Sequence, residues 1–260
     1  MAETRKRYSL NQKQLHILML LYKFRFITIP LLTTYKNLKS NSLQRTFDIL
    51  LEENYIDRRF DVSYKIDRKP AIYYLAAKGV AALKADPRFN PVTLHSYYKN
   101  RSVTDVFMQH AVDTLEVYNN LKHSYEDRFE IFTRQEVAHF DDFPETKPDL
   151  YLRGDREYFL TLAYDTQLFL VRKRLAEYIT HFDEDGWAKG RYPALLFIFA
   201  DSNSERRFLE FANTSLESAG IDTDELSIGT TTMRALRGIP AISAIWSFTG
   251  DSHTLKQLAA

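Results

Sequence analysis

The pattern of apolar residues in the first 85 positions constrains the fold most, because its period changes from that of helices to that of strands and back. Helical spacing predicts helices over residues 10–24, 28–35, 40–54 and 76–83. Residues 55–60 and 71–75 are rich in aromatic and β-branched side chains, which predicts two strands joined as a hairpin. This order of elements is typical of a winged helix-turn-helix domain, here spanning residues 1–86.

The third predicted helix separates its apolar and polar residues most clearly. One stripe with helical spacing consists of Leu43, Phe47, Leu50 and Leu51. The opposite side carries side chains that can hydrogen-bond to base edges in the major groove, namely Asn41, Ser42, Gln44 and Arg45. Such residues also form ordinary solvated helix faces. In a winged helix, this helix would enter the major groove of duplex DNA.

Several basic residues could contact the phosphates on either side of that groove. The predicted hairpin tip carries Lys65, Arg68 and Lys69, and Lys39 directly precedes the third helix. The N-terminal residues Arg5, Lys6 and Arg7 could reach a minor groove. Alternatively, these three form a solubilising terminus without structure.

The distribution of charge supports a polyanionic partner for the first part of the chain. The net charge is only +1, but residues 1–100 carry 18 Lys and Arg against 8 Asp and Glu. The remaining residues carry 17 against 26. Such asymmetry is expected when one part of a chain meets nucleic acid, so double-stranded DNA is the predicted partner.

A linker and a connecting helix are expected over residues 87–124, followed by an α/β domain with a mixed sheet over 125–260. The chain as a whole is predicted to be α+β. The connecting helix has one apolar face, with members Val103, Val106, Phe107, His110, Val112 or Leu115, and Tyr118. Predicted strands cover residues 129–134, 149–154, 157–165, 193–200 and 241–248, and predicted helices cover 167–182 and 205–220.

Two aspartates of the second domain offer the best case for catalysis. Asp149 and Asp165 lie on neighbouring predicted strands and could hold Mg²⁺ beside a phosphodiester, with Glu136 as a further acid. Nucleases of this pattern also need an acid two residues before a lysine on the second strand. Here Ala163 and Asp165 occupy those positions, and Lys173 belongs to the following helix. A metal-dependent nuclease is therefore only the alternative to a non-enzymatic protein.

No other catalytic or cofactor-binding pattern is found. The sequence has no cysteine, and it contains no phosphate-binding glycine loop, nucleophile elbow or HExxH zinc motif. We therefore expect neither a cofactor nor a metal. It also lacks an apolar signal segment or a run of membrane-spanning length, which predicts a cytoplasmic protein without membrane contact. Abundant Tyr and Phe favour self-association as a dimer.

Short motifs in this order resemble the replication-relaxation family. The winged-helix order is followed by VTDVFMQHAVDTLEV, then KPDLYLR, YFLTLAYDTQ and KRLAEYITHF, all within about residues 10–200. The family's usual Glu-x-Asp-Thr is reduced here to Asp165 and Thr166, with Ala163 at the Glu position. The resemblance implies a degenerate PD-(D/E)xK-like second domain and DNA binding at an origin or operator, with a homodimer as the expected form.

The role implied is non-catalytic: replication or transfer of a plasmid or mobile element, with replication or relaxosome proteins as partners, or transcription regulation. A further alternative is a protein-interaction adaptor whose N-terminal domain never touches DNA.

Overall fold

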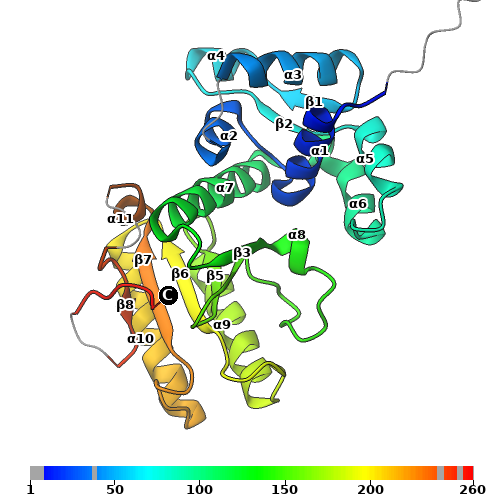
Figure 1. Ribbon diagram of the computed structural model, residues 1–260. Coiled ribbons are helices and arrows are strands. Elements are labelled where there is room, and N and C mark those ends of the chain that lie inside the picture. The colour runs from blue at the N-terminus through cyan, green and yellow to red at the C-terminus, as the bar shows by residue number, and fades with distance from the viewer. Residues whose placement is uncertain (1–8, 37–39, 239–242, 251–253, 260) are drawn as a thin grey trace, which may run out of the picture. The chain divides into compact units, whose positions relative to one another are not determined.

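The computed structural model is an α+β protein that divides into two compact units, residues 1–115 and 116–260 (Figure 1). It describes residues 9–36, 40–238, 243–250 and 254–259. The boundary between the units lies within helix α7 (Asp105–Tyr125).

The N-terminal unit consists mainly of helices with one pair of strands. Its elements before α7 are α1 (Gln12–Phe24), α2 (Ile29–Lys36), α3 (Ser40–Glu52), β1 (Ile56–Arg59), α4 (Val62–Ile66), β2 (Ile72–Leu75), α5 (Ala77–Lys84), α6 (Pro91–Ser96) and the 3-10 helix η1 (Tyr97–Ser102). Asn11 begins α1 with a reciprocal capping box, in which its side chain and that of Gln14 each accept from the other's backbone N–H.

The apolar stripe of α3 fixes this helix on the strand pair. Leu43, Phe47 and Leu50 are buried, and the Phe47 ring packs edge-on against Tyr73 of β2, with ring centroids 4.6 Å apart. Strands β1 and β2 are antiparallel, and Ile56 lies opposite Leu75. All four residues of β2 are buried, so this strand is part of the core on which α3 packs.

Two segments between the predicted elements are helical rather than irregular. The connection between β1 and β2, expected to be a hairpin tip, contains α4, which Asp61 caps by accepting from the backbone N–H groups of Ser63 and Tyr64. The expected linker after residue 87 contains α6 and η1, whose Leu94 and Tyr97 are buried. Both departures reflect local capping and burial that apolar periodicity does not report.

The buried face of α7 agrees with the prediction at Val112, Leu115 and Tyr118 but not in the first turn of the helix. Val106 and Phe107 are 63% and 41% exposed, whereas Met108 and Val112 are buried in a cluster with Phe26 of the same unit. The prediction that Val106 and Phe107 belong to the buried face was therefore wrong by about one residue in helical phase.

The C-terminal unit is built on one six-stranded mixed sheet of order β3-β4-β5-β6-β7-β8. Its strands are β3 (Glu130–Thr133), β4 (Leu150–Arg153), β5 (Tyr158–Leu162), β6 (Ala194–Phe199), β7 (Ile228–Thr232) and β8 (Ser247–Phe248). The central strands β5, β6 and β7 are parallel, and the outer pairings are antiparallel.

Helices α9 (Leu168–Asp183) and α10 (Ser202–Ala219) connect the three parallel strands and cover one face of the sheet (Figure 1). Right-handed crossovers between adjacent parallel strands place both helices on the same side. Their core consists of alternate strand residues and helix residues, among them Phe159, Phe197, Val171, Leu175 and Phe208. The short helices α8 (Arg134–Val137) and α11 (Met233–Gly238) follow β3 and β7.

The prediction from sequence omitted one strand of this sheet and made another too long. Strand β7 was not predicted, because Ile228 is its only strongly apolar residue and three threonines form its second half. The last strand, predicted over 241–248, is confined to Ser247–Phe248 among the described residues, and positions 241 and 242 lie outside them.

None of the helices in the described part of the chain combines the length and the apolar character that crossing a membrane requires.

Candidate functional site

The polar face of α3 is open to solvent, as required of a surface that meets a macromolecule. Asn41, Ser42, Gln44 and Arg45 are all exposed on the side opposite the buried stripe. The Gln44 amide donates to the Asp48 carboxylate at 2.9 Å, so this amide is partly engaged within the helix. Arg45 forms no ion pair with any described residue, which leaves its guanidinium available to a partner.

The connection between β1 and β2 places three predicted cations on the surface. Lys65, Arg68 and Lys69 are exposed. Lys69 forms an ion pair with Asp67 at 2.9 Å, and this hydrogen-bonded carboxylate raises the pKa of Lys69. Lys65 instead lies 5.8 Å from the centre of the Phe60 ring. Lys65 and Arg68 therefore keep more uncompensated charge than Lys69, which ranks them above it as phosphate contacts.

Four predicted DNA contacts cannot be placed. Arg5, Lys6, Arg7 and Lys39 lie outside the described residues.

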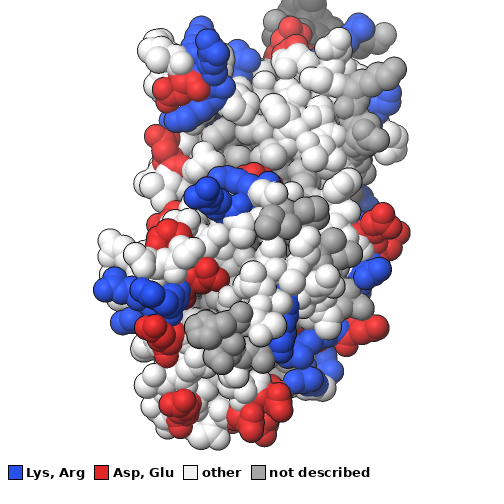
Figure 2. All heavy atoms as spheres, turned by 90° about the vertical axis from the view of Figure 1, so that its left-hand side faces the viewer, with Lys and Arg blue, Asp and Glu red and all other residues white. Residues whose placement is uncertain are grey.

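The basic surplus of the N-terminal part does not come from the segment that contains α3 and the strand pair. Residues 40–75 contain six Lys and Arg and six Asp and Glu, so this segment is neutral. On the face drawn in Figure 2, basic side chains form separate groups with acidic side chains interspersed. Any affinity of α3 for DNA would therefore depend on the placement of individual side chains more than on a broad positive surface.

Sequence reasoning missed an apolar group on the same connection. Phe60, Val62 and Ile66 are 39%, 71% and 74% exposed. Val62 and Ile66 stand four residues apart in α4 and so lie on one side of that helix. The Asp61 cap followed by this spacing was the available signal. Apolar side chains that stand in solvent are suited to contact with another protein.

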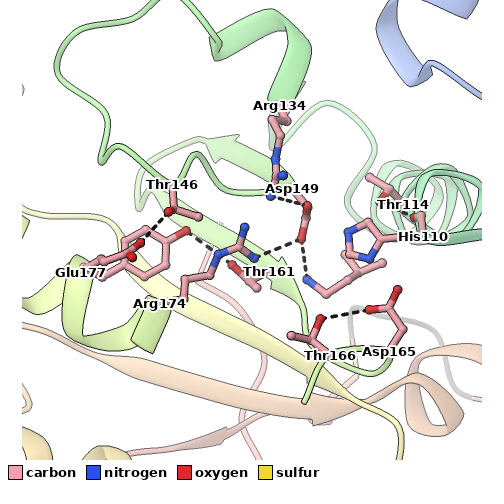
Figure 3. Close-up of polar contacts among 12 residues, drawn as sticks. His110, Thr114, Arg134, Thr146, Asp149, Thr161, Asp165, Thr166, Arg174 and Glu177 are labelled. Atoms are coloured by element: carbon pink, nitrogen blue, oxygen red, sulfur yellow. Dashed lines mark hydrogen bonds and ion pairs between the residues drawn. The ribbon is translucent and has the colours of Figure 1, made fainter. Parts of the chain in front are cut away.

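In the C-terminal unit, Asp149 is held by two arginines rather than left open for a metal (Figure 3). Its side chain is 4% exposed. One carboxylate oxygen accepts from Arg134 at 2.8 Å, and the other lies 3.8 Å from Arg174 and accepts from the backbone N–H of Leu162 at 2.9 Å. These contacts join the start of β4 to α8, β5 and α9. The carboxylate is thus already neutralised by protein cations.

The other residues of the nuclease alternative make separate local contacts. Asp165 is exposed in the turn after β5, where it accepts from the Thr166 hydroxyl at 3.2 Å. Glu136 closes the capping box of α8 by accepting from the Thr133 backbone N–H at 2.8 Å. Lys173 is exposed on α9, 4.0 Å from Glu177. Within the described residues, no three His, Asp or Glu side chains converge as metal ligands would.

No protein-family model, curated protein or solved structure matches this chain.

Proposed function

We propose that the N-terminal unit binds duplex DNA as a winged helix-turn-helix, with α3 in the major groove and the β1–β2 connection on the flanking backbone. The observation that carries this proposal is the exposed face of α3, where Asn41, Gln44 and Arg45 lie opposite the buried Leu43, Phe47 and Leu50. These are side chains that form paired hydrogen bonds with adenine and guanine edges.

In this arrangement the two sets of contacts have different roles. Arg45 would discriminate between bases, whereas Lys65 and Arg68 would bind phosphates whatever the sequence. The resemblance to the replication-relaxation family suggests where such binding acts: in plasmid or mobile-element replication or transfer, or in transcriptional control. The protein would catalyse no reaction itself, and its C-terminal unit would serve dimerisation or contact with replication or relaxosome proteins.

Fluorescence anisotropy of labelled duplexes with the full chain tests the proposal. After selection of a preferred site, we expect Arg45→Ala to reduce the difference in affinity between that site and unrelated DNA. Lys65→Ala should weaken both duplexes alike and lower the slope of log affinity against log salt by about 0.9. Lys99→Ala, which removes an exposed lysine of η1, is the matched control and should change neither quantity.

Two outcomes would contradict this assignment. Absence of salt-dependent binding by the wild-type chain would reject DNA as the partner. Equal loss of affinity for all duplexes in Arg45→Ala would show that α3 is not the reading helix.

A second candidate, a protein-interaction adaptor, is favoured by one observation. The neutral charge of residues 40–75 and the exposed Val62 and Ile66 suit a protein surface better than a polyanion. Replacing both Val62 and Ile66 by serine separates the two candidates. Under the adaptor hypothesis this double variant loses self-association or partner binding in light scattering, while under the DNA hypothesis it keeps its DNA affinity.

A further inference from the structure

A pocket of about 350 Å³ opens in the C-terminal unit at the edge of the sheet where the parallel strands begin. Arg156 precedes β5 by two residues, Arg191 precedes β6 by three, and Ser227 directly precedes β7. Because neighbouring parallel strands start at the same edge, these three residues come together there. The antiparallel β8 ends at the same edge, and Lys256 of the C-terminal segment completes the wall.

Cations outnumber carboxylates among the described residues that line this pocket. Among the described residues, Arg156, Arg191 and Lys256 line it together with one carboxylate, Asp224. Arg191 donates to the backbone oxygen of Asp224 rather than to its carboxylate. No ion pair joins Arg156 or Arg191 to a described residue, so the charge of these two guanidinium groups is uncompensated within the described part of the chain.

Arg156 gives the most direct reason to expect an anion in this pocket. Its Nε atom is buried and has no hydrogen-bond partner among the described residues. Burial and the neighbouring Arg191 both lower the pKa of Arg156, since each disfavours its charged form. Two guanidinium groups close together repel each other, and one of them has a buried donor here, so an anion between them would be stabilising.

Hydroxyl groups supply further donors around the same space. Thr223, Ser227 and Thr249 line the pocket. The Thr249 oxygen accepts from the backbone N–H of Ile228 at 3.2 Å, so its own proton is directed elsewhere. The Tyr158 hydroxyl is already used, because it donates to the backbone oxygen of Ala259 at 3.0 Å. Cations with two or three hydroxyl donors match an anion that has several oxygens and more than one charge.

Two other pockets of this unit differ in the charge of their described lining residues. The pocket along α10 is lined by Glu205, Glu210 and Glu217 against a single arginine. The pocket at the opposite edge of the sheet contains Arg234 and Arg237, but Arg237 is already paired with Glu116 at 2.6 Å.

We propose that the pocket formed by Arg156, Arg191 and Lys256 binds the phosphate group of a small molecule. Arginine forks fit the oxygens of a phosphate in pairs, and a dianion compensates charge that a monocarboxylate would leave in excess. The volume lies at the lower end of ligand pockets, which suits free phosphate or a mononucleotide better than a polymer. This site is separate from the DNA contacts proposed for α3.

Isothermal titration of the full chain, in chloride buffer at constant ionic strength, tests the proposal with inorganic phosphate, adenosine monophosphate and adenosine. We expect saturable binding of phosphate with a Kd of roughly millimolar or below. Arg156→Gln and Arg191→Gln should each weaken it about tenfold or more. Arg207→Gln, which removes an exposed arginine of α10, is the matched control and should bind as the wild type does.

Comparing these ligands also distinguishes a nucleotide from free phosphate as the ligand. Tighter binding of adenosine monophosphate than of phosphate supports a nucleotide ligand, and equal binding supports free phosphate. The proposal is overturned if neither ligand saturates, if both arginine variants bind normally, or if adenosine binds as tightly as its monophosphate. Arg191 is exposed, so Arg191→Gln keeps the test valid if Arg156→Gln does not fold. Unchanged phosphate binding in Arg45→Ala separates this result from the DNA proposal.

Discussion

At the scale of single residues, Asp149 shows how one side chain can be mistaken for a catalytic group. Its position after Pro148, ahead of a strand, matches a metal-binding pattern in sequence. Its partners Arg134 and Arg174 are 15 and 25 residues away along the chain, and no local pattern predicts that they meet it. By contrast, the exposed face of α3 followed directly from the spacing of its buried leucines and phenylalanine.

We expect Asp149→Asn to destabilise the protein by about 1–3 kcal/mol, because both arginines lose their counter-charge. The cost is limited by Arg134, which is 40% exposed and can be solvated. Urea unfolding followed by tryptophan fluorescence measures the change. Asp155→Asn, in the exposed β4–β5 turn, is the control and should stay within about 0.5 kcal/mol of the wild type. Equal effects of the two changes would contradict a structural role for Asp149.

His181 makes stability depend on pH. Burial, and secondarily Lys147, lower the pKa of this imidazole, which contacts the Tyr192 hydroxyl at 2.9 Å. With a folded pKa below the unfolded value of about 6.5, the unfolded state binds the proton first as pH falls. The contribution is therefore complete above that value and lost progressively below it. Urea titrations should show stability falling from about pH 7 to pH 5, with a shallower fall in His181→Gln.

At the scale of elements, the backbone of helix α5 packs closely against the backbone just before β1. A Cβ atom on Gly79 would lie 2.1 Å from the carbonyl oxygen of Tyr55, just before β1. Helix propensity alone would favour alanine at this position. We expect Gly79→Ala instead to destabilise the N-terminal unit by about 1–3 kcal/mol, measured by thermal unfolding in circular dichroism. Gly238→Ala provides the control and should be close to neutral, because a Cβ atom there would meet no described residue within 4 Å.

Most elements were predicted from sequence, and the failures have physical reasons. Apolar β6 and amphipathic α3 and α9 carry strong periodic signals. Strand β7 lacks one, because Thr230, Thr231 and Thr232 are buried by satisfying their hydroxyls rather than by being apolar. Strand order is not encoded in any local pattern either. The pocket of Arg156, Arg191 and Lys256 depends on this strand order and therefore could not be predicted from the sequence.

At the scale of the whole molecule, unfolding of the C-terminal unit can be followed separately, because tryptophan fluorescence arises from that unit alone. Both tryptophans, Trp187 and Trp246, belong to the C-terminal unit. Phe47 is fully buried in the N-terminal unit, and Phe208 is fully buried in the C-terminal one.

We expect Phe47→Ala to cost about 3–5 kcal/mol of stability in the N-terminal unit through the cavity it leaves. Urea unfolding should then shift more in circular dichroism than in tryptophan fluorescence. Phe208→Ala is the matched change in the other unit and should shift the fluorescence transition directly. Equal shifts of both signals in Phe47→Ala would show that the chain unfolds as one cooperative system.

The threonines of β7 have a consequence for how this sheet excludes wrong assemblies. The Thr230 hydroxyl donates to Glu205 at 3.1 Å, Thr231 donates to the backbone oxygen of Ile245 at 2.7 Å, and Thr232 accepts from the N–H of Ala235 at 3.1 Å. A one-residue slip would separate the Thr230 and Thr231 hydroxyls from these partners, whereas the local contact of Thr232 would move with the strand. An apolar strand could still bury its side chains after such an error. In β7, a shifted register would instead bury hydroxyls without hydrogen bonds. The polarity of this strand therefore disfavours wrong pairings of the sheet while the chain folds.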